Sequence, residues 1–397
     1  MNILYVCPFS HALNISPALH LAQLIANDGH HVHFYSVKTP YVVFKDRSLI
    51  SKVAKTPENV NMHFIENRYP VSNIAYPLIN VFQEFRDLQQ IIKEYDIDIL
   101  HFYFPEHLFS LPILKKESLG NLPIVLTVCG LPGYGWSYND KIVDYIGKTY
   151  VKIFSRRIIE KANLVVPLSS QVREDMIRLG IDEDKIVDNL NPYGIDTSHF
   201  KPCENKHDLR EKFHLPLDAF IVTYAGRLVK LKQVDVFIKL LGDLQKVIPE
   251  LVFLCIGDGP EKEELVKLSR SLNYDNVIFR DFVPQDTLAQ MLSASDIFLL
   301  LSKGEGNPHI LLEAGSVGLP IIATNVGGCG DIVKPCHNGF LLESVSSETL
   351  KECIITIRTN YEQYSTSARQ YMLDYFEWDK IRQNYLNLYT QLLSDRR

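Results

Sequence analysis

Residues Phe220–Lys232 read FIVTYAGRLVKLK, and this stretch decides the fold class. Its first six residues, Phe220–Ala225, are mostly β-branched or aromatic and predict a buried strand. Gly226 follows as a turn residue, and a helical pattern begins near Gln233. A strand that passes through a tight turn directly into a helix is typical of a parallel α/β sheet.

The same alternation of short apolar runs with helical patterns extends along the whole chain. After this stretch, strands are predicted at Leu251–Ile256, Val277–Arg280, Ile297–Leu301 and Pro320–Ala323. Before it, strands are predicted at Asn2–Cys7, His31–Val37, Ile97–Tyr103, Ile124–Val128 and Leu164–Leu168, and a helix at Pro17–Asn27. The segment Asn191–Pro202 has two prolines, a glycine and several turn formers, so it predicts a linker.

A chain of 397 residues is too long for one hydrophobic core, so two domains are expected. We predict an α/β protein with two Rossmann-like, doubly wound domains, at residues 1–195 and 196–376, which face each other across a cleft. A helical and aromatic segment at about 377–397 completes the chain. In open α/β sheets, ligands bind beyond the carboxyl ends of the strands.

Bulk composition excludes several classes of protein. The net charge of −6 argues against general nucleic-acid binding. Seven cysteines, an odd number without a CxxC pair, do not predict a disulfide framework or a zinc site. The first residues do not resemble a signal peptide, and no run of about 18 apolar residues is present. We therefore expect a cytoplasmic protein, which can still sit at the inner face of a membrane.

Two cations follow the strand Phe220–Ala225. Gly226 permits close approach of the backbone to a ligand, and Arg227 and Lys232 stand at the strand end and at the helix start. Arg offers a bidentate fork and Lys a point charge, so both suit a single diphosphate. The alternative is a pair of solvated surface cations.

Two carboxylates belong to the segment Ser302–Glu313, which follows another predicted strand. Pro308 suits the first turn of a helix, and the free N–H groups around Gly306–His309 then form an anion site. Glu305 precedes that helix, whereas Glu313 lies in an apolar stretch and needs hydrogen-bond partners such as ribose hydroxyls. The alternative is one Glu favoured by the helix dipole and another that reaches the surface.

Two glycine turns, Gly257–Pro260 and Asn325–Gly330, also follow predicted strands of the second half. Each alone is a weak signal. Four such features at the strand ends of one half provide the cations, backbone N–H groups and carboxylates that a nucleotide-diphosphate sugar requires.

Two stretches resemble metal sites without predicting one. Asp96-Ile-Asp98 directly precedes a strand and is interpreted as a turn, and His101 within that strand as a core histidine. His30-His31-Val-His33 lacks a local cysteine or carboxylate that would complete a ligand set. We expect no metal and no other cofactor.

The second half resembles the retaining family 4 glycosyltransferases of the GT-B type. The resemblance is clear from Gly194 to Trp378 and looser before it. It is carried by Gly194-Ile-Asp, Phe200, Pro202, Gly226-Arg-Leu, Lys232, Gly257-Asp-Gly-Pro260, Ala294-Ser-Asp296, Glu305-Gly-Asn-Pro308, Glu313-Ala, Gly318-Leu-Pro320 and Gly327-Gly328.

The resemblance implies a role for each of these positions. Arg227 and Lys232 would clamp the donor diphosphate and stabilise the leaving group, Glu305 would lie against the donor sugar, and Glu313 would hold the ribose. The remaining donor contacts implied are Gly226, Gly257, Gly259, Phe282, Val283, Gly306, Asn307, Pro308 and His309. Retention of configuration, a UDP-sugar donor, no metal and a terminal helix that crosses back to the first, acceptor-binding domain are also implied.

The first half departs from the family pattern at two places. The family commonly has a histidine where this chain has Cys129. The paired-glycine loop after the first strand is replaced by Phe9–Pro17, which is similar to the His-containing loop of the inverting family 1 enzymes. His11 is therefore a candidate general base, although a loop histidine in water is the alternative. Acceptor contacts are predicted at His11, Asn14, Cys129 and Gly130.

The segment Lys141–Lys161 carries six basic and two acidic side chains. On one helix, Lys141, Lys148, Lys152 and Arg156 share a face with Tyr145, and Ile142, Ile146, Ile153 and Phe154 lie elsewhere. This face favours peripheral contact with a membrane that holds a lipid-linked acceptor. The alternative is a solvated face on a helix that covers the sheet.

The sequence thus predicts a glycosyltransferase of polysaccharide biosynthesis, which acts on a glycan, a lipid-linked or a small-molecule acceptor. Two alternatives stay open. One is another enzyme on the same fold, an epimerase or a phosphorylase. The other is a non-catalytic partner subunit that binds a nucleotide sugar.

Overall fold

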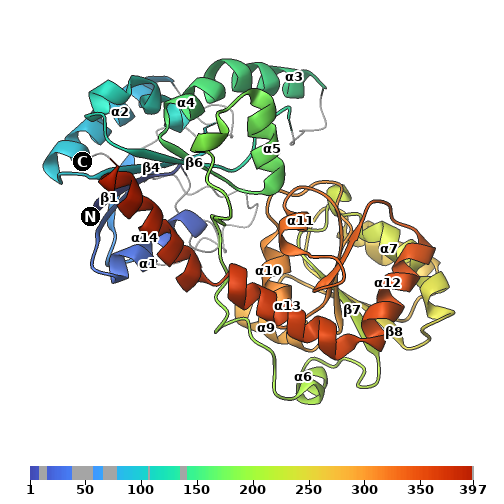
Figure 1. The fold of residues 1–397 in the computed structure, drawn as a ribbon. Coiled ribbons are helices and arrows are strands. Elements are labelled where there is room, and N and C mark those ends of the chain that lie inside the picture. The colour runs from blue at the N-terminus through green and yellow to red at the C-terminus, as the bar shows by residue number, and fades with distance from the viewer. Residues whose placement is uncertain (9–15, 38–56, 66–77, 106–107, 135–140, 396–397) are drawn as a thin grey trace. The chain divides into compact units, whose positions relative to one another are not determined.

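The computed structural model describes residues 1–8, 16–37, 57–65, 78–105, 108–134 and 141–395. The chain divides into two compact units (Figure 1). Unit 1 consists of Met1–Gly194 and Trp378–Arg397, and unit 2 of Ile195–Glu377. The chain therefore passes between the units twice, at Gly194–Ile195 and at Glu377–Trp378.

Unit 1 contains a six-stranded parallel sheet in the order β3-β2-β1-β4-β5-β6. The strands are β1 (Asn2–Val6), β2 (His31–Val37), β3 (Asn61–Ile65), β4 (Ile99–Tyr103), β5 (Ile124–Val128) and β6 (Leu164–Pro167). Leu4 of β1 pairs with His33 of β2 on one side and with Leu100 of β4 on the other. The strand order reverses at β1, as in a doubly wound fold.

Helices cover both faces of this sheet. Those of unit 1 are α1 (Pro17–Asn27), α2 (Leu78–Glu94), η2 (Leu108–Leu119), α3 (Lys141–Tyr150), η3 (Val151–Ser155), α4 (Arg156–Lys161), α5 (Ser170–Leu179), η4 (Glu183–Lys185) and α14 (Trp378–Ser394). α1 and α14 pack in one core with Ile3 and Tyr5 of β1. α2, η2, α4 and α5 pack in another core with Leu4 and Val6. The alternation of side chains along β1 thus divides the core in two.

Unit 2 contains a second six-stranded parallel sheet in the order β12-β11-β10-β7-β8-β9. The strands are β7 (Phe220–Ala225), β8 (Leu251–Ile256), β9 (Val277–Arg280), β10 (Ile297–Leu300), β11 (Ile321–Thr324) and β12 (Gly339–Leu342). The helical elements are α6 (Lys206–Lys212), η5 (Lys230–Lys232), α7 (Val234–Gln245), α8 (Lys262–Ser271), α9 (Gln285–Ser293), α10 (His309–Ser316), α11 (Cys329–Ile332), α12 (Ser347–Thr359) and α13 (Tyr361–Tyr375). These elements share one hydrophobic core.

A buried ion pair fixes the start of this sheet. Arg210 of α6 donates to the Asp296 carboxylate at 2.8 Å, and the same carboxylate oxygen accepts from the backbone N–H of Ile221 at 2.7 Å. A buried charge is tolerated when it is paired and hydrogen-bonded in this way. The contact ties α6 to β7 and to the segment before β10.

The predicted fold class of two doubly wound α/β domains is confirmed in the two sheets. Two edge strands, β3 and β12, were not predicted: β3 mixes polar with apolar residues, and β12 is a four-residue run that begins with a glycine. The predicted helical segment Lys141–Lys161 is helical throughout, but it contains a π-helical turn, η3, between α3 and α4. Within the described residues, no helix combines the length and the apolar character needed to cross a bilayer.

Candidate active site

The turns after β7 and β8 lie against each other in unit 2. The backbone N–H of Leu228 donates to the carbonyl of Asp258 at 2.9 Å. A Cβ placed on Gly257 would lie 1.9 Å from the carbonyl oxygen of Gly226, and one on Gly259 would lie 2.3 Å from that of Leu228. Both distances are far below van der Waals contact, so only glycine permits this packing. The predicted donor residues Gly226, Gly257 and Gly259 are thus brought together.

The most compact polar cluster of this region joins Lys232 to Glu305. Lys232 Nζ donates to Glu305 Oε1 at 2.5 Å, and the hydroxyl of Ser302 donates to the same oxygen at 2.5 Å. The Glu305 side chain is 8% exposed and that of Lys232 is 21% exposed. Ser302 directly follows Leu301 at the end of β10, and its carbonyl accepts from the Thr324 hydroxyl at 2.6 Å. Strands β7 and β10 are neighbours, which explains why residues 73 positions apart meet.

The glycine turn after β11 supports the loop that carries Glu305. The N–H of Gly328 donates to the carbonyl of Gly306 at 2.8 Å. Gly327 has φ +53°, and a Cβ on it would lie 1.8 Å from the carbonyl oxygen of Glu305. The close approach of the Gly327 backbone to the Glu305 carbonyl therefore helps to fix the position of Glu305.

Arg227 is an exposed cation that follows β7, five residues before Lys232 in the sequence. No ion pair or hydrogen bond of its guanidinium is found among the described residues. Its carbonyl is fixed, because the Tyr224 hydroxyl donates to it at 2.8 Å. An unpaired guanidinium on a fixed backbone is available for an anionic ligand.

Helix α10 begins at His309, with Pro308 as its N-cap residue. Burial lowers the pKa of His309 to about 4, so this imidazole is neutral at physiological pH. Asn307 is half-buried and Gly306 is exposed. The loop Gly306–His309 therefore presents backbone and amide groups next to Glu305, and no additional formal charge.

Glu313 lies along α10 and is partly buried. Desolvation raises the pKa of its carboxyl from 4.5 to about 7. No hydrogen bond of this carboxyl is found within the described residues. Its charged form is thus disfavoured in the free protein, and a bound hydroxyl or amide would stabilise it.

Phe282 and Val283 follow β9, the strand beyond β8 in the sheet. Phe282 is 62% exposed, and Val283 packs partly against the core of unit 2. They lie at the same sheet edge as the glycine turns, since all strands of this sheet are parallel. Within the described residues, the hydrogen bonds of the Lys232–Glu305 pair do not involve them.

In unit 1, Cys129 follows β5, and its Sγ lies 3.4 Å from the hydroxyl of Tyr193. Gly130 is buried next to it. His11 and Asn14 lie outside the described residues. Of the predicted acceptor residues, the structure therefore describes only Cys129 and Gly130.

A buried polar network in unit 1 was not predicted. His101 contacts the Tyr389 hydroxyl through Nδ1 at 2.6 Å and the Thr127 hydroxyl through Nε2 at 2.9 Å, and Tyr389 contacts the Tyr5 hydroxyl at 3.0 Å. Burial lowers the pKa of His101 to about 3, so the ring is neutral. The sequence indicates that His101 belongs to the core, but nothing in it points to a partner 288 residues away.

One histidine of β2, His33, forms a pair with His63 of β3. His33 Nδ1 lies 3.0 Å from His63 Nε2. Among the residues that the structure describes, no group of three or more histidines, cysteines and carboxylates is arranged to hold a metal ion.

Two family models match consecutive parts of the chain. Residues 18–199 match the model described as Glycosyltransferase Family 4, and residues 205–371 match the model described as Glycosyl transferases group 1.

Several curated relatives are similar to the chain over part or all of its length. N-acetyl-alpha-D-glucosaminyl L-malate synthase of Bacillus anthracis is 24% identical over 94% of this chain and 93% of its own. TuaC of Bacillus subtilis is 29% identical over 68% of this chain, but the match spans only 63% of TuaC. The UDP-Gal:alpha-D-GlcNAc-diphosphoundecaprenol alpha-1,3-galactosyltransferase of Escherichia coli is 29% identical over 67% of each chain.

Solved structures with the same fold cover nearly the whole chain. Sucrose-phosphate synthase from Thermosynechococcus elongatus superposes with a TM-score of 0.75 at 20% identity, over 100% of both chains. Anabaena HepE in complex with UDP superposes with a TM-score of 0.73 at 17% identity, over 98% of this chain and 100% of HepE. With both family models matched and this fold shared, the chain belongs to the group 1, family 4 glycosyltransferases of GT-B fold.

Proposed function

We propose that this chain transfers a sugar, with retention of anomeric configuration, from a nucleotide-diphosphate sugar to a glycan or lipid-linked acceptor. The observation that carries this proposal is the Lys232–Glu305–Ser302 cluster at the ends of β7 and β10. This cluster holds the Lys232 ammonium against an oriented carboxylate. The turn that precedes Lys232 in the sequence carries Arg227, whose guanidinium has no partner among the described residues.

Each part of the donor has a matching group in unit 2. Arg227 and Lys232 offer positive charge to the two phosphates, and in the transition state they stabilise the charge that develops on the departing diphosphate. Glu305, with its carboxylate held by two donors, accepts from hydroxyls of the donor sugar. Glu313 accepts from the ribose, and Phe282 and Val283 border the base.

The state of Glu305 supports a mechanism without a covalent sugar–enzyme intermediate. Its Oε1 accepts from both an ammonium and a hydroxyl at 2.5 Å. These bonds stabilise the carboxylate and lower its nucleophilicity. We therefore assign Glu305 to positioning the donor sugar. We propose that the acceptor attacks the anomeric carbon on the same face from which the diphosphate departs.

UDP is the nucleotide that we propose. Two relatives support it, since the Escherichia coli enzyme is named as a UDP-Gal-dependent galactosyltransferase and HepE was solved in complex with UDP. The proposal needs no divalent metal for donor binding, because Arg227 and Lys232 supply the positive charge.

Arg227→Ala should weaken UDP binding by roughly ten- to hundredfold, because it removes a charge-assisted, bidentate contact to phosphate. Isothermal titration with UDP, GDP and ADP, with and without Mg²⁺, would measure this. Lys230→Ala is the matched control, since Lys230 is an exposed cation three residues away. Equal UDP affinity in Arg227→Ala and the wild type would contradict the assigned phosphate site.

Glu313→Gln should stabilise the free protein at pH 8 while weakening its affinity for UDP about tenfold. Below pH 4.5 the carboxyl is protonated in both the folded and the unfolded chain, so it has no effect there. From pH 4.5 to about 7 only the unfolded chain ionises, so stability falls as pH rises, and above 7 the loss is constant. At about 1.4 kcal/mol per pKa unit, the full loss is up to about 3 kcal/mol.

Denaturant unfolding at pH 4 and at pH 8 checks this prediction. The variant should be more stable than the wild type at pH 8 but not at pH 4. The free energy of unfolding should therefore change less between these two pH values in the variant than in the wild type. If Glu313→Gln loses stability at pH 8, its carboxylate has a partner that the structure does not contain, and the ribose assignment fails.

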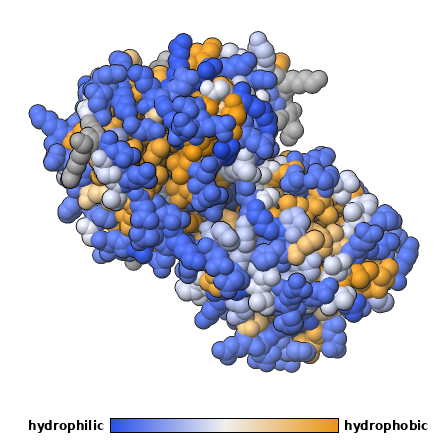
Figure 2. Space-filling view, viewed as in Figure 1, coloured by the Kyte–Doolittle hydropathy of each residue, from blue (hydrophilic) through white to orange (hydrophobic). Residues whose placement is uncertain are grey.

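The surface of unit 1 supports a lipid-linked acceptor. Most of the surface visible in Figure 2 is hydrophilic, yet Ile142, Tyr145 and Ile146 of α3 are 71%, 74% and 62% exposed. Ile153 and Phe154 of η3 are also exposed, so the apolar residues do not cover the sheet. With Lys148 and Lys152 on the same segment, this is an amphipathic surface of the kind that binds an anionic membrane.

Replacing Ile142 and Ile146 together by serine should lower binding to phosphatidylglycerol vesicles at least tenfold, because two large side chains no longer insert. Co-sedimentation at low and high salt measures the apolar and the electrostatic parts separately. Ile355→Ser, at an exposed isoleucine of unit 2, is the control. Undiminished binding of the double variant would rule out this segment as the membrane contact.

A further inference from the structure

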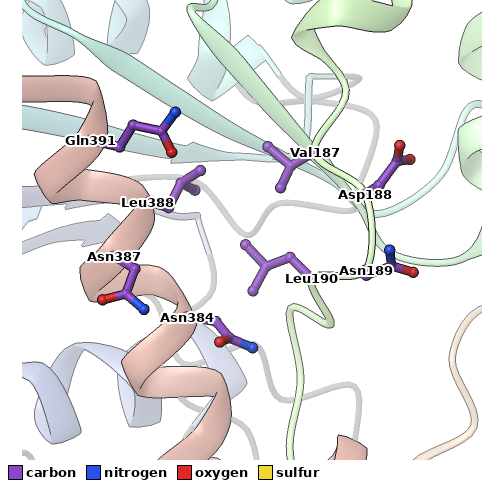
Figure 3. A pocket seen from close by; sticks show the side chains of 8 residues that line it. All are labelled: Val187, Asp188, Asn189, Leu190, Asn384, Asn387, Leu388 and Gln391. Atoms are coloured by element: carbon purple, nitrogen blue, oxygen red, sulfur yellow. The ribbon is translucent and has the colours of Figure 1, made fainter. Parts of the chain in front are cut away.

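A hollow of about 290 Å³ lies in unit 1 between α14 and the segment Val187–Leu190 (Figure 3). Its lining residues are Val187, Asp188, Asn189, Leu190, Asn384, Asn387, Leu388 and Gln391. Both walls belong to the same unit, so the shape of the hollow does not depend on where unit 2 lies. None of the predicted donor and acceptor residues that the structure describes lines it.

The lining is polar but almost without free charge. Asn384, Asn387 and Gln391 follow one another along one side of α14, and Asn189 stands on the opposite wall in a left-handed conformation with φ +57°. Among the described lining residues Asp188 alone is charged, and its carboxylate accepts from Arg173 Nε at 2.8 Å. The hollow therefore presents amides, each with donors and an acceptor.

Apolar side chains form the base between these amides. Leu190 is buried, and Leu388 packs against the same core as α1 and α14. Figure 3 shows Leu190 and Leu388 between the two walls, with the amides around them. An apolar base with amides around it fits a ring that has one apolar face and hydroxyls at its edge.

The composition of α14 is unusual for an exposed helix face. Gln383–Ser394 contains no charged residue, although 22% of the chain is charged. Asn is a poor helix former, yet α14 places Asn384 and Asn387 at exposed positions. Asn387 Oδ1 accepts from Gln383 Nε2 one turn earlier at 3.2 Å, and this pair supports the helix. The choice of Asn384 is instead consistent with a ligand that carries hydroxyl groups.

We propose that this hollow is a subsite for one neutral sugar ring of a glycan chain. The amides would pair with vicinal hydroxyls and the leucines would contact the apolar face of the ring. The lack of a free cation disfavours a phosphate or a nucleotide. The volume is at the lower end of small-molecule sites, which span about 300–1,000 Å³, and therefore suits one ring.

The choice of ligand class rests on the proposed function, and the subsite deepens it. A ring held here would belong to a glycan of several residues, part of which lies away from the transfer centre. A weak contact of this kind raises the effective concentration of the acceptor end. Long acceptors should therefore have a lower KM than short ones, with an unchanged kcat.

Methyl-labelled NMR tests the subsite directly, with Leu190 and Leu388 as reporters and Leu312 of unit 2 as a distant reference. The probes are neutral tetrasaccharides of glucose, galactose and N-acetylglucosamine, compared with UDP alone. At least one tetrasaccharide should shift the signals of Leu190 and Leu388 but not that of Leu312. UDP should leave Leu190 and Leu388 unshifted.

Two variants complete the test. Replacing Asn384 and Asn387 together by alanine should weaken tetrasaccharide binding at least fivefold, whereas Thr390→Ala, at an exposed position of α14 outside the lining, should bind as the wild type does. UDP affinity should be equal in all three proteins. The proposal is overturned if no tetrasaccharide shifts the reporters, if the double variant binds normally, or if sedimentation shows that a second copy of the chain occupies this face. Failure of UDP binding with intact glycan binding would count against the proposed function alone.

Discussion

Replacing Lys232 by methionine should lower kcat/KM for sugar transfer by roughly a thousandfold. The variant loses a cation that stabilises the departing diphosphate, and loss of one such group typically costs 10²–10³ in rate. It should also lose stability, by about 3–5 kcal/mol, because the largely buried Glu305 carboxylate would keep a single partner among the described residues, the Ser302 hydroxyl. Measurements of kcat/KM and of denaturant unfolding on the same protein give both values.

The double variant Lys232→Met with Glu305→Gln separates the two effects. Removing both charges abolishes the uncompensated carboxylate, so most of the lost stability should return. Activity should be at least as low as in Lys232→Met, because the cation is still missing and the carboxylate assigned to the donor sugar is removed as well. If activity returns together with stability, Lys232 has a structural role and does not act on the donor.

Gly327→Ala should reduce transfer at least a hundredfold while costing only about 1–3 kcal/mol of stability. The new Cβ would lie 1.8 Å from the carbonyl oxygen of Glu305, and backbone atoms must shift to relieve that contact. The left-handed φ of +53° adds a smaller cost. Strand β10 is held by pairing with two neighbouring strands, whereas Glu305 lies in the loop that follows it. The loop should therefore move, and the Glu305 carboxylate should move with it.

Gly304→Ala is the matched control in the same loop. A Cβ at Gly304 would meet only a terminal carbon of Leu231, at 3.9 Å, which is ordinary contact. This variant should retain activity and stability close to those of the wild type. Equal loss of activity in both variants would mean that the loop tolerates no side chain anywhere, and would remove the special role of Gly327.

The sheets could be predicted from the sequence because most of their strands are short, mainly apolar runs followed by glycine, proline or polar turns. β7, β8 and β9 have the bounds that were predicted. β3 was missed because Asn61–Ile65 mixes polar with apolar residues at the sheet edge. Local periodicity does not reveal a strand whose main support is pairing with a neighbour.

The site could be predicted only as a set of residues. The motifs identify Lys232 and Glu305 separately, but their shared hydrogen bond follows from the order of β7 and β10 in the sheet. The exposure of Ile142 and Ile146 was not foreseen. A helical wheel shows which residues share a face of a helix, but it does not show which face packs against the sheet. The π-helical turn at Val151–Ser155 further shifts the phase between α3 and α4.

The docking of α14 has a consequence for synthesis of the chain. Tyr385 and Tyr389 are fully buried beside Ile3 and Tyr5, so the last helix completes the core that the first strand begins. Domains generally fold in order as they leave the ribosome. Here unit 2, an uninterrupted segment, emerges whole before α14, and unit 1 must wait with an open apolar face until α14 has been synthesised. Unit 1 therefore finishes folding after unit 2, although its first strands are made earlier, and nascent unit 1 is the stage at which a chaperone would be needed.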